Sequence, residues 1–226
     1  MSISGDAAFC SWSGGKESAL ALFRAIRSGA NVTRLVNMLA EDGAHSRTHG
    51  ITAELIQFQA EAIGIPLIQR PSSWETYEQE FKAVLRAMPD EGICRGIFGD
   101  IDLEGHREWV ERVSSECSIT PSLPLWREGR DDLLSEFIRS GFKAVIVAVD
   151  KRYLDETWIG REIDGAFVND IRSQGVDICG EAGEYHTFVY DGPIFKNPVL
   201  FRKGAIRSDG DYVLLDIVGP SIKGAA

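Results

Sequence analysis

The stretch FCSWSGGKESAL, from Phe9 to Leu20, joins an apolar run to a helix-like pattern through two glycines and a lysine. Glycine weakens strands and helices. A Gly-Gly pair at this junction therefore indicates that the backbone there has to be free of side chains. The pattern is not a Walker A loop, because Cys10 stands at that motif's first glycine and Glu17 follows the lysine in place of Ser or Thr. The three spaced glycines of the dinucleotide fingerprint are also missing.

The composition predicts an ordinary globular protein. The chain has 226 residues, 44% of them apolar, enough for one large domain or one domain with a small appendage. We see no apolar run of membrane-spanning length and no secretion signal, so we expect a cytoplasmic protein. The four cysteines are too far apart for a zinc ribbon or a CxxC motif. The formal charge of −10 argues against nucleic acid as a partner, because its binding needs a basic surface.

Apolar β-branched runs alternate with segments of helical spacing over most of the chain. This alternation predicts βαβ units and a parallel sheet with helices on both faces. From Val176 onward the runs are short and separated by turn residues, so we place a domain change near 150–175, between residues 1–150 and a smaller domain of residues 151–226. The expected strands are 7–12, 33–40, 65–70, 92–100, 143–150, 199–201 and 212–218, and the expected helices are 16–28, 51–63, 74–88, 103–117 and 131–140.

The glycine-rich stretch therefore lies between the first strand and the first helix. Ligands of open parallel sheets bind at the carboxyl ends of the strands, and a helix N-terminus with free N–H groups favours an anion. Gly14 and Gly15 let the backbone approach closely. Ser13, Lys16 and Ser18 offer two hydroxyls and a charge. The alternative is a serine-capped helix without a ligand, which needs no Gly-Gly pair.

Three stretches of the chain resemble one protein family. SGGKES (13–18) is similar to the S-G-G-x-D-S pyrophosphate loop of the N-type ATP pyrophosphatases, the PP-loop superfamily. GEAGEYHTFVYDGPIF (180–195) resembles the G-E-x-G-E-[YF]-x-T-F-V-x-D-x-P-[IL]-F signature of the diphthine–ammonia ligase family. LDETWIGREID (154–164) resembles that family's L-D-x-x-W-x-G-R segment. The similarity runs in family order over residues 7–200.

The resemblance implies a fold and a nucleotide site. The fold is a five-stranded parallel HUP-type sheet flanked by helices, followed by a smaller C-terminal subdomain with short strands. The loop would hold the ATP phosphates, and adenine would lie near the backbone at residues 38–40. Glu17 departs from the Asp of the wider superfamily, which would shift a metal or phosphate contact by one methylene. The implied cofactors are ATP and Mg²⁺, and the implied nucleotide-binding residues are Ser13, Gly14, Gly15, Lys16, Glu17, Ser18, Met38, Leu39, His49 and Asp100.

The resemblance also implies a reaction. In PP-loop enzymes an acceptor oxygen attacks the α phosphate of ATP, pyrophosphate leaves, and a nucleophile such as ammonia displaces AMP from the adenylate. The acceptor of diphthine–ammonia ligases is the carboxylate of diphthine, a modified histidine of a translation elongation factor. We therefore expect an ATP-dependent ligase with ATP, ammonia and that factor as partners, and a homodimer stays open. The implied catalytic residues are Lys16, Glu181, Glu184 and His186, and the implied substrate-binding residues are Arg161, Tyr185 and Thr187.

Several of these residues have a purely structural alternative. The carboxylates of residues 181–187 could hold Mg²⁺, collect ammonium or accept a proton, or they could cap a turn. Asp100 could face the nucleotide or cap a helix, and Arg161 could bind an anion or pair with a nearby carboxylate. His45 and His49 are four residues apart, but their segment is a polar loop without the Glu of HExxH. We expect no zinc there, and His49 is the better candidate to touch the nucleotide.

Three other functions stay open. The first is the same chemistry on a carboxylate other than diphthine, in a host that makes no diphthamide. The second is a tRNA-modifying PP-loop enzyme, against which the negative charge and the lack of paired cysteines argue. The third is a nucleotide-binding module without catalysis, against which the intact SGGK and the polar cluster at 181–187 argue.

Overall fold

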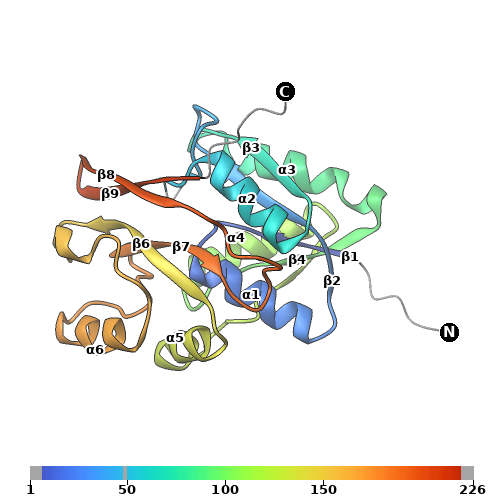
Figure 1. Ribbon diagram of the computed structural model, residues 1–226. Coiled ribbons are helices and arrows are strands. Elements are labelled where there is room, and N and C mark those ends of the chain that lie inside the picture. Colours follow the sequence, from blue (N-terminus) through green and yellow to red (C-terminus); the bar gives the residue numbers. More distant parts are fainter. Residues whose placement is uncertain (1–6, 48–49, 220–226) are drawn as a thin grey trace.

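The computed structural model describes residues 7–47 and 50–219, which form two sheets (Figure 1). The first has five parallel strands in the order β3-β2-β1-β4-β5, and the second has four antiparallel strands in the order β7-β6-β9-β8. The predicted parallel sheet is confirmed. The strands are β1 (Ala7–Ser11), β2 (Asn31–Leu39), β3 (Leu67–Pro71), β4 (Ile93–Ile97), β5 (Thr120–Ser122), β6 (Lys143–Asp150), β7 (Tyr185–Asp191), β8 (Arg202–Asp209) and β9 (Tyr212–Val218).

Helices cover both faces of the parallel sheet, as the alternating pattern predicts. Side chains alternate along β1, so Ala8 and Cys10 pack on α1 and α2 while Phe9 packs on α3 and α4. The helices are α1 (Lys16–Arg27), α2 (Ala53–Ile63), α3 (Tyr77–Ala87), α4 (Glu104–Ser115), α5 (Arg130–Arg139) and α6 (Gly165–Ser173), with short 3₁₀ turns η1 (Pro89–Glu91) and η2 (Glu156–Trp158).

The ends of α2 follow from its sequence. Thr52 precedes the helix, and its side chain accepts a hydrogen bond from the N–H of Leu55, which satisfies one donor of the first turn. Gly64 ends the helix with φ of +84°, in the left-handed region that glycine enters without strain. The predicted stop at Gly64 is therefore confirmed.

The strand predicted at 143–150 is confirmed but lies in the other sheet, and the strand predicted at 199–201 is wrong. The run 143–150 forms β6 as expected, but β6 lies in the antiparallel sheet between β7 and β9 rather than in the parallel sheet. A continuous apolar run indicates a strand buried on both faces, and central strands of either sheet type meet that condition. The fifth parallel strand is β5, an edge strand, where Pro121 is tolerated. The predicted strand at 199–201 is absent, and β8 pairs with β9 instead.

The two sheets share one hydrophobic core. Helix α1 packs against β7 of the second sheet as well as against the parallel sheet, and Figure 1 shows it between them. One continuous cluster therefore includes Leu22, Leu55, Ile146 and Phe188, from both sheets and their helices. A smaller cluster lies under α3 and α4. Because the larger core extends across both sheets, the division of the chain at residue 150 stays a prediction.

Candidate functional site

The phosphate loop, residues 13–18, joins β1 to α1. Gly14 has φ of +84°, and a Cβ there would lie 2.6 Å from Ile56 Cδ1 and 2.7 Å from Gln59 Oε1. The first glycine of the pair is thus required by backbone conformation and by packing on α2. The Ser13 and Ser18 hydroxyls lie 3.2 Å apart, and Ser18 donates to the carbonyl of the intervening Gly15 at 3.0 Å. The two serines therefore brace the loop.

The N-terminus of α1 presents free donors. Its N-cap, Gly15, makes no side-chain cap. The N–H of Lys16 donates to Thr187 Oγ1 at 3.1 Å, whereas the N–H groups of Glu17 and Ser18 donate no hydrogen bond within residues 7–47 and 50–219. Two unpaired amides at a helix N-terminus favour an anion. This geometry supports the predicted phosphate site.

Lys16 carries a buried charge beside these amides. Its ammonium lies 2.6 Å from Glu17 Oε1, donates to the carbonyl of Cys179 at 2.6 Å, and lies 4.5 Å from the centroid of the Tyr185 ring. Burial alone would lower the pKa of Lys16, but the attraction of Glu17 and further groups raises it above its usual value. The charge is therefore kept at neutral pH.

The motif at 180–187 reaches the phosphate loop from the second sheet. Tyr185 donates through its hydroxyl to the carbonyl of Ile178 at 2.6 Å, and its ring packs under Lys16. Glu184 is buried, and its two carboxylate oxygens accept from the N–H groups of Asp177 and Ala182. These contacts favour a role for Glu184 in shaping the turn, and its predicted catalytic role stays a prediction.

The two segments enclose a cleft of about 300 Å³, here called the phosphate cleft. Glu181 lines it, and burial followed by the nearby charge of Glu17 raises the pKa of Glu181 to about 8. His186 lines it too, with its ring stacked on Tyr212 at a centroid distance of 6.3 Å. The lining residues are Ser11, Ser13, Lys16, Glu17, Ser18, Gly99, Asp100, His106, Cys179, Gly180, Glu181, Gly183, Tyr185 and His186.

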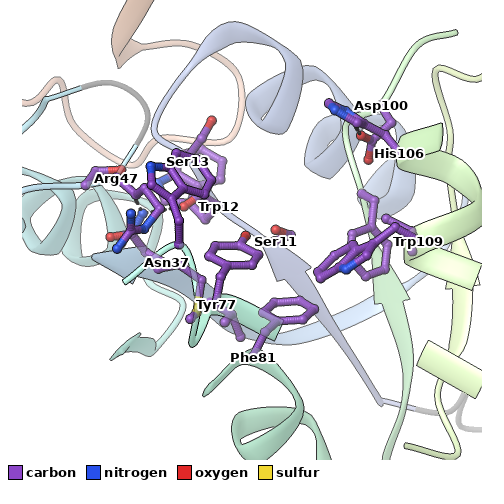
Figure 2. Close-up of a pocket in the computed structure, with 16 residues that line it drawn as sticks. Ser11, Trp12, Ser13, Asn37, Arg47, Tyr77, Phe81, Asp100, His106 and Trp109 are labelled. Carbon is purple, nitrogen blue, oxygen red and sulfur yellow. Dashed lines mark hydrogen bonds and ion pairs between the residues drawn. The ribbon is translucent and has the colours of Figure 1, made fainter. Parts of the chain in front are cut away.

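A second cavity of about 360 Å³, here called the aromatic cavity, adjoins the phosphate cleft (Figure 2). Asp100 and His106 line both, 3.4 Å apart, and the hydrogen bond to Asp100 raises the pKa of His106 above its usual value. Met38 lines the aromatic cavity, so the predicted adenine region lies at its wall. The lining residues are Ser11, Trp12, Ser13, Val36, Asn37, Met38, Ser46, Arg47, Trp74, Tyr77, Phe81, Phe98, Asp100, His106, Trp109 and Val110.

Some predicted residues do not meet at these cavities. Leu39 is buried and lines neither, and Thr187 is buried beneath the loop. Arg161 lies before α6, stacks on Trp158 at 4.4 Å and pairs with Asp170 at 2.6 Å, so the structure does not bring it to the site. His49 lies outside the described residues.

Gln59 is a supporting residue that the sequence analysis missed. It is fully buried on α2, accepts from the indole N–H of Trp12 at 2.9 Å, and donates to the carbonyls of Gly14 at 3.0 Å and Val189 at 2.6 Å. It therefore ties the phosphate loop to both sheets. A signal was present, because Gln59 is the polar member of the buried helical stripe Leu55, Ile56, Gln59, Ala60 and Ile63.

Neither a metal-binding cluster nor a membrane-spanning helix is found among the described residues. Residues 7–47 and 50–219 contain no group of three or more His, Cys, Asp or Glu side chains placed to hold a metal ion. Within the same ranges, every helix is too short or too polar to cross a membrane.

Comparison with known proteins identifies relatives. Residues 7–121 match the diphthamide synthase N-terminal domain, and residues 129–217 match the diphthamide synthase C-terminal domain. The diphthine–ammonia ligase of Rattus norvegicus is 27% identical over 213 residues, which are 83% of this chain and 80% of that protein. That of Danio rerio is 27% identical over 230 residues (88% and 89%), and that of Homo sapiens 28% over 213 residues (83% and 80%).

A solved structure is also similar, though weakly. It is described as a predicted subunit of a tRNA methyltransferase from Methanocaldococcus jannaschii, with a TM-score of 0.47 and 14% identity over 84% of this chain and 98% of that one. The family matches go further, because they cover both segments that meet at the phosphate cleft, the loop at 13–18 and the motif at 180–187. From these two matches, which together span most of the residues described, we conclude that the chain belongs to the diphthamide synthase family.

Proposed function

We propose that this protein is an ATP-dependent ligase that joins ammonia to a carboxylate, as in the conversion of diphthine to diphthamide. The relatives named as diphthine–ammonia ligases support this proposal. The observation that carries it is the phosphate cleft, where Lys16 and Glu17 of the matched N-terminal domain face Glu181 and His186 of the matched C-terminal domain. A protein that only binds a nucleotide would not need Glu181 and His186 of the C-terminal domain to line the same cleft.

The reaction has two steps. A carboxylate oxygen of the acceptor bonds to the α phosphorus of ATP, and the bond to the β phosphate oxygen breaks, so pyrophosphate leaves. Ammonia then attacks the carbonyl carbon of the acyl adenylate, gives up a proton and expels AMP. The free amides of Glu17 and Ser18 and the ammonium of Lys16 would hold the departing pyrophosphate, whose charge they offset.

Glu181 is our candidate for the proton acceptor. It comes from the motif 180–187, lines the cleft opposite the loop, and has a pKa of about 8, between those of an ordinary carboxylate and of ammonium. A base is most effective when its pKa lies near the working pH. Tyr185 and His186 would complete the acceptor side, and the acceptor itself would be a diphthine-bearing elongation factor.

Mg²⁺ belongs to the proposal through ATP. It usually takes one or two carboxylates together with substrate phosphates and waters, so it needs no cluster of three side chains. Glu17 and Asp100 line the phosphate cleft and would hold it beside the phosphates, where its charge would offset theirs.

The test is a product analysis. The protein is incubated with ATP, Mg²⁺, ammonium and either a diphthine-bearing elongation factor or a set of small carboxylates, and the nucleotide and amide products are measured. We expect AMP and pyrophosphate in equal amounts with the amide. Amide formed only on a small carboxylate would redirect the proposal to another acceptor, and ADP with phosphate in place of AMP would overturn it.

A further inference from the structure

Asp102, Arg130 and Asp177 form a charged bridge, here called the Arg130 bridge, that the proposed reaction does not use. Arg130, the first residue of α5, donates to both carboxylate oxygens of Asp102, from Nε at 3.1 Å and from Nη2 at 2.8 Å. Its Nη1 donates to Asp177 Oδ2 at 2.5 Å. Such a forked guanidinium contact fixes direction as well as distance. Arg130 therefore ties together two segments that are far apart in the chain.

The two segments carry two walls of the phosphate cleft. Asp102 lies in the loop between β4 and α4, shortly after Asp100, which lines the cleft. Asp177 lies just ahead of the motif 180–187, whose Glu181 lines the cleft as well. The members of the Arg130 bridge do not line the cleft themselves. The bridge therefore supports the walls from behind.

Asp177 holds the backbone of the segment 177–184. Its Oδ1 accepts from the N–H of Cys179 and its Oδ2 from the N–H of Glu181, both at 2.9 Å. The oxygen that accepts from Glu181 is also the one that Arg130 contacts. The side chain of Asp177 is only 9% exposed, so its charge needs a partner within the protein, and the guanidinium supplies it.

The other wall has supports of its own. The N–H of Phe98 donates to the carbonyl of Ser122 at 2.9 Å, and the N–H of Arg127 donates to the carbonyl of Ile101 at 2.7 Å. These backbone hydrogen bonds hold the loop after β4 without the help of Arg130. Loss of the Arg130 bridge should therefore displace the segment 177–184 more than the loop that carries Asp100.

We propose that Arg130 and Asp177 are positioning residues that hold Glu181 where it takes the proton from ammonia, an inference that rests on the proposed function. They act through the backbone N–H of Glu181, which bonds to the same oxygen as Arg130. A displacement of about 1 Å can cost about 10² in rate. Amidation should therefore depend on the Arg130 bridge far more than adenylation, in which Glu181 has no role.

The first experiment measures the two steps separately in the full chain. Exchange of labelled pyrophosphate into ATP reports adenylation, with Mg²⁺ and the diphthine-bearing elongation factor, or the small carboxylate that the product analysis identifies, but without ammonium. Amide formation after addition of ammonium reports both steps. Arg130→Lys keeps the charge and loses the fork. We expect it to exchange pyrophosphate as the wild type does and to form amide at least about 10-fold more slowly. The ratio of the two rates does not depend on the folded fraction, so lower stability alone cannot produce this result.

Two further variants test the contact and its specificity. Asp177→Asn leaves one acceptor oxygen for two N–H groups and no charge for Arg130, so it should slow amide formation at least as much. The double variant should be no slower than Asp177→Asn, because both residues act through one contact. Arg172→Lys is the matched control, since Arg172 pairs with Asp131 beside the bridge at 2.5 Å, but both side chains are more than half exposed. It should change neither rate.

A second readout needs no activity. Hydrogen exchange, followed by mass spectrometry, reports on peptides that cover 177–184, where the N–H groups of Cys179 and Glu181 bond to Asp177. Arg130→Lys should make this segment exchange about 10-fold faster and leave β1 unchanged. Arg172→Lys should leave both unchanged.

The outcomes separate this inference from the proposed function. An unchanged amide rate in Arg130→Lys, or equal losses of amide formation and pyrophosphate exchange, would overturn the inference, while amide formed by the wild type would leave the proposed function standing. If the wild type forms neither AMP nor amide, the proposed function fails together with the role of Glu181. Unchanged hydrogen exchange at 177–184 in Arg130→Lys would refute the positioning role in either case.

Discussion

Lys16 is the residue whose removal should affect the chemistry most directly. Its charge survives burial because Glu17 lies 2.6 Å away, and it stands beside the two free amides of α1. Removing one donor from a preorganised anion site costs about 10²–10³ in turnover. We therefore expect Lys16→Ala to lose at least about 10² in the rate of AMP formation at saturating substrates. Lys143→Ala, at the exposed start of β6, should keep full activity. Near-normal turnover by a folded Lys16→Ala would remove Lys16 from the mechanism.

Glu181 should set the pH dependence of the reaction. With a pKa of about 8, its carboxyl is largely protonated at neutral pH and cannot accept a proton from ammonia. In the free enzyme, kcat/KM should rise with pH and level off above about 8, after correction for the titration of ammonium itself. Glu181→Gln should lose both amide formation and this rise of kcat/KM with pH. An identical pH profile in the variant would exclude Glu181 as the base.

The same residue should influence stability. Its pKa in the folded chain, about 8, lies above the ordinary 4.5, so between these values the folded chain holds a proton that the unfolded chain has released. The free energy of unfolding should therefore fall as pH rises from 4.5 to 8, and Glu181→Gln should reduce that fall. Urea denaturation of both proteins near the two pH values measures the difference. An equal fall in both would show that Glu181 titrates normally.

At the scale of elements, Gln59 joins α2 to the phosphate loop and to β7. Its side chain makes three buried hydrogen bonds, to Trp12, Gly14 and Val189. Gln59→Leu keeps the volume but removes the three hydrogen bonds and leaves the buried indole N–H of Trp12 without this acceptor, while the Gly14 carbonyl keeps the N–H of Val189. An unpaired buried donor costs about 1–3 kcal/mol, and each of the other two lost bonds about 0.5–1.5 kcal/mol. We expect the free energy of unfolding to drop by about 2–4 kcal/mol and ATP affinity to fall with it. Gln57→Leu on the same helix, whose amide only pairs with Glu61 at the surface, is the control and should change little.

The local patterns predicted most elements but not their pairing. Helix α1 begins at the predicted Lys16, and α2 ends at the predicted Gly64, because caps and glycines act within a few residues. The strand β6 was found, yet its sheet was not, because KAVIVAVD satisfies burial on both faces of either sheet type. Three-residue β5 is too short to show a period.

The candidate site was likewise predicted only in part from the sequence. The phosphate loop was predicted because its glycines, lysine and serines are contiguous in the chain. The aromatic cavity was not, because its walls come from distant segments, with Trp12 after β1, Tyr77 on α3 and Trp109 on α4. Arg161 was assigned to the substrate from a motif alone, while its contacts with Trp158 and Asp170 depend on the tertiary fold.

At the scale of the whole molecule, α1 is packed on both sides. The parallel sheet covers one side, and β7 and α5 approach the other, where Arg24 of α1 pairs with Glu136 and donates to the carbonyl of Pro124 at 2.8 Å. The phosphate loop at the start of α1 is held by the same arrangement, since Thr187 and Val189 of β7 bond to Lys16 N–H and to the Gly14 carbonyl. The anion site therefore depends on both sheets.

This packing predicts that the two sheets unfold together. A shared core makes each part a poor folding unit on its own, so urea should unfold the chain in one transition, with coincident curves by circular dichroism and tryptophan fluorescence. A fragment ending at Glu128 keeps the parallel sheet but exposes Leu20 and Leu22, which now lie in the shared core. We expect it to lack a cooperative transition and to bind no ATP. If the fragment unfolds cooperatively and binds ATP as the full chain does, the sheets are independent domains and the anion site needs only the first.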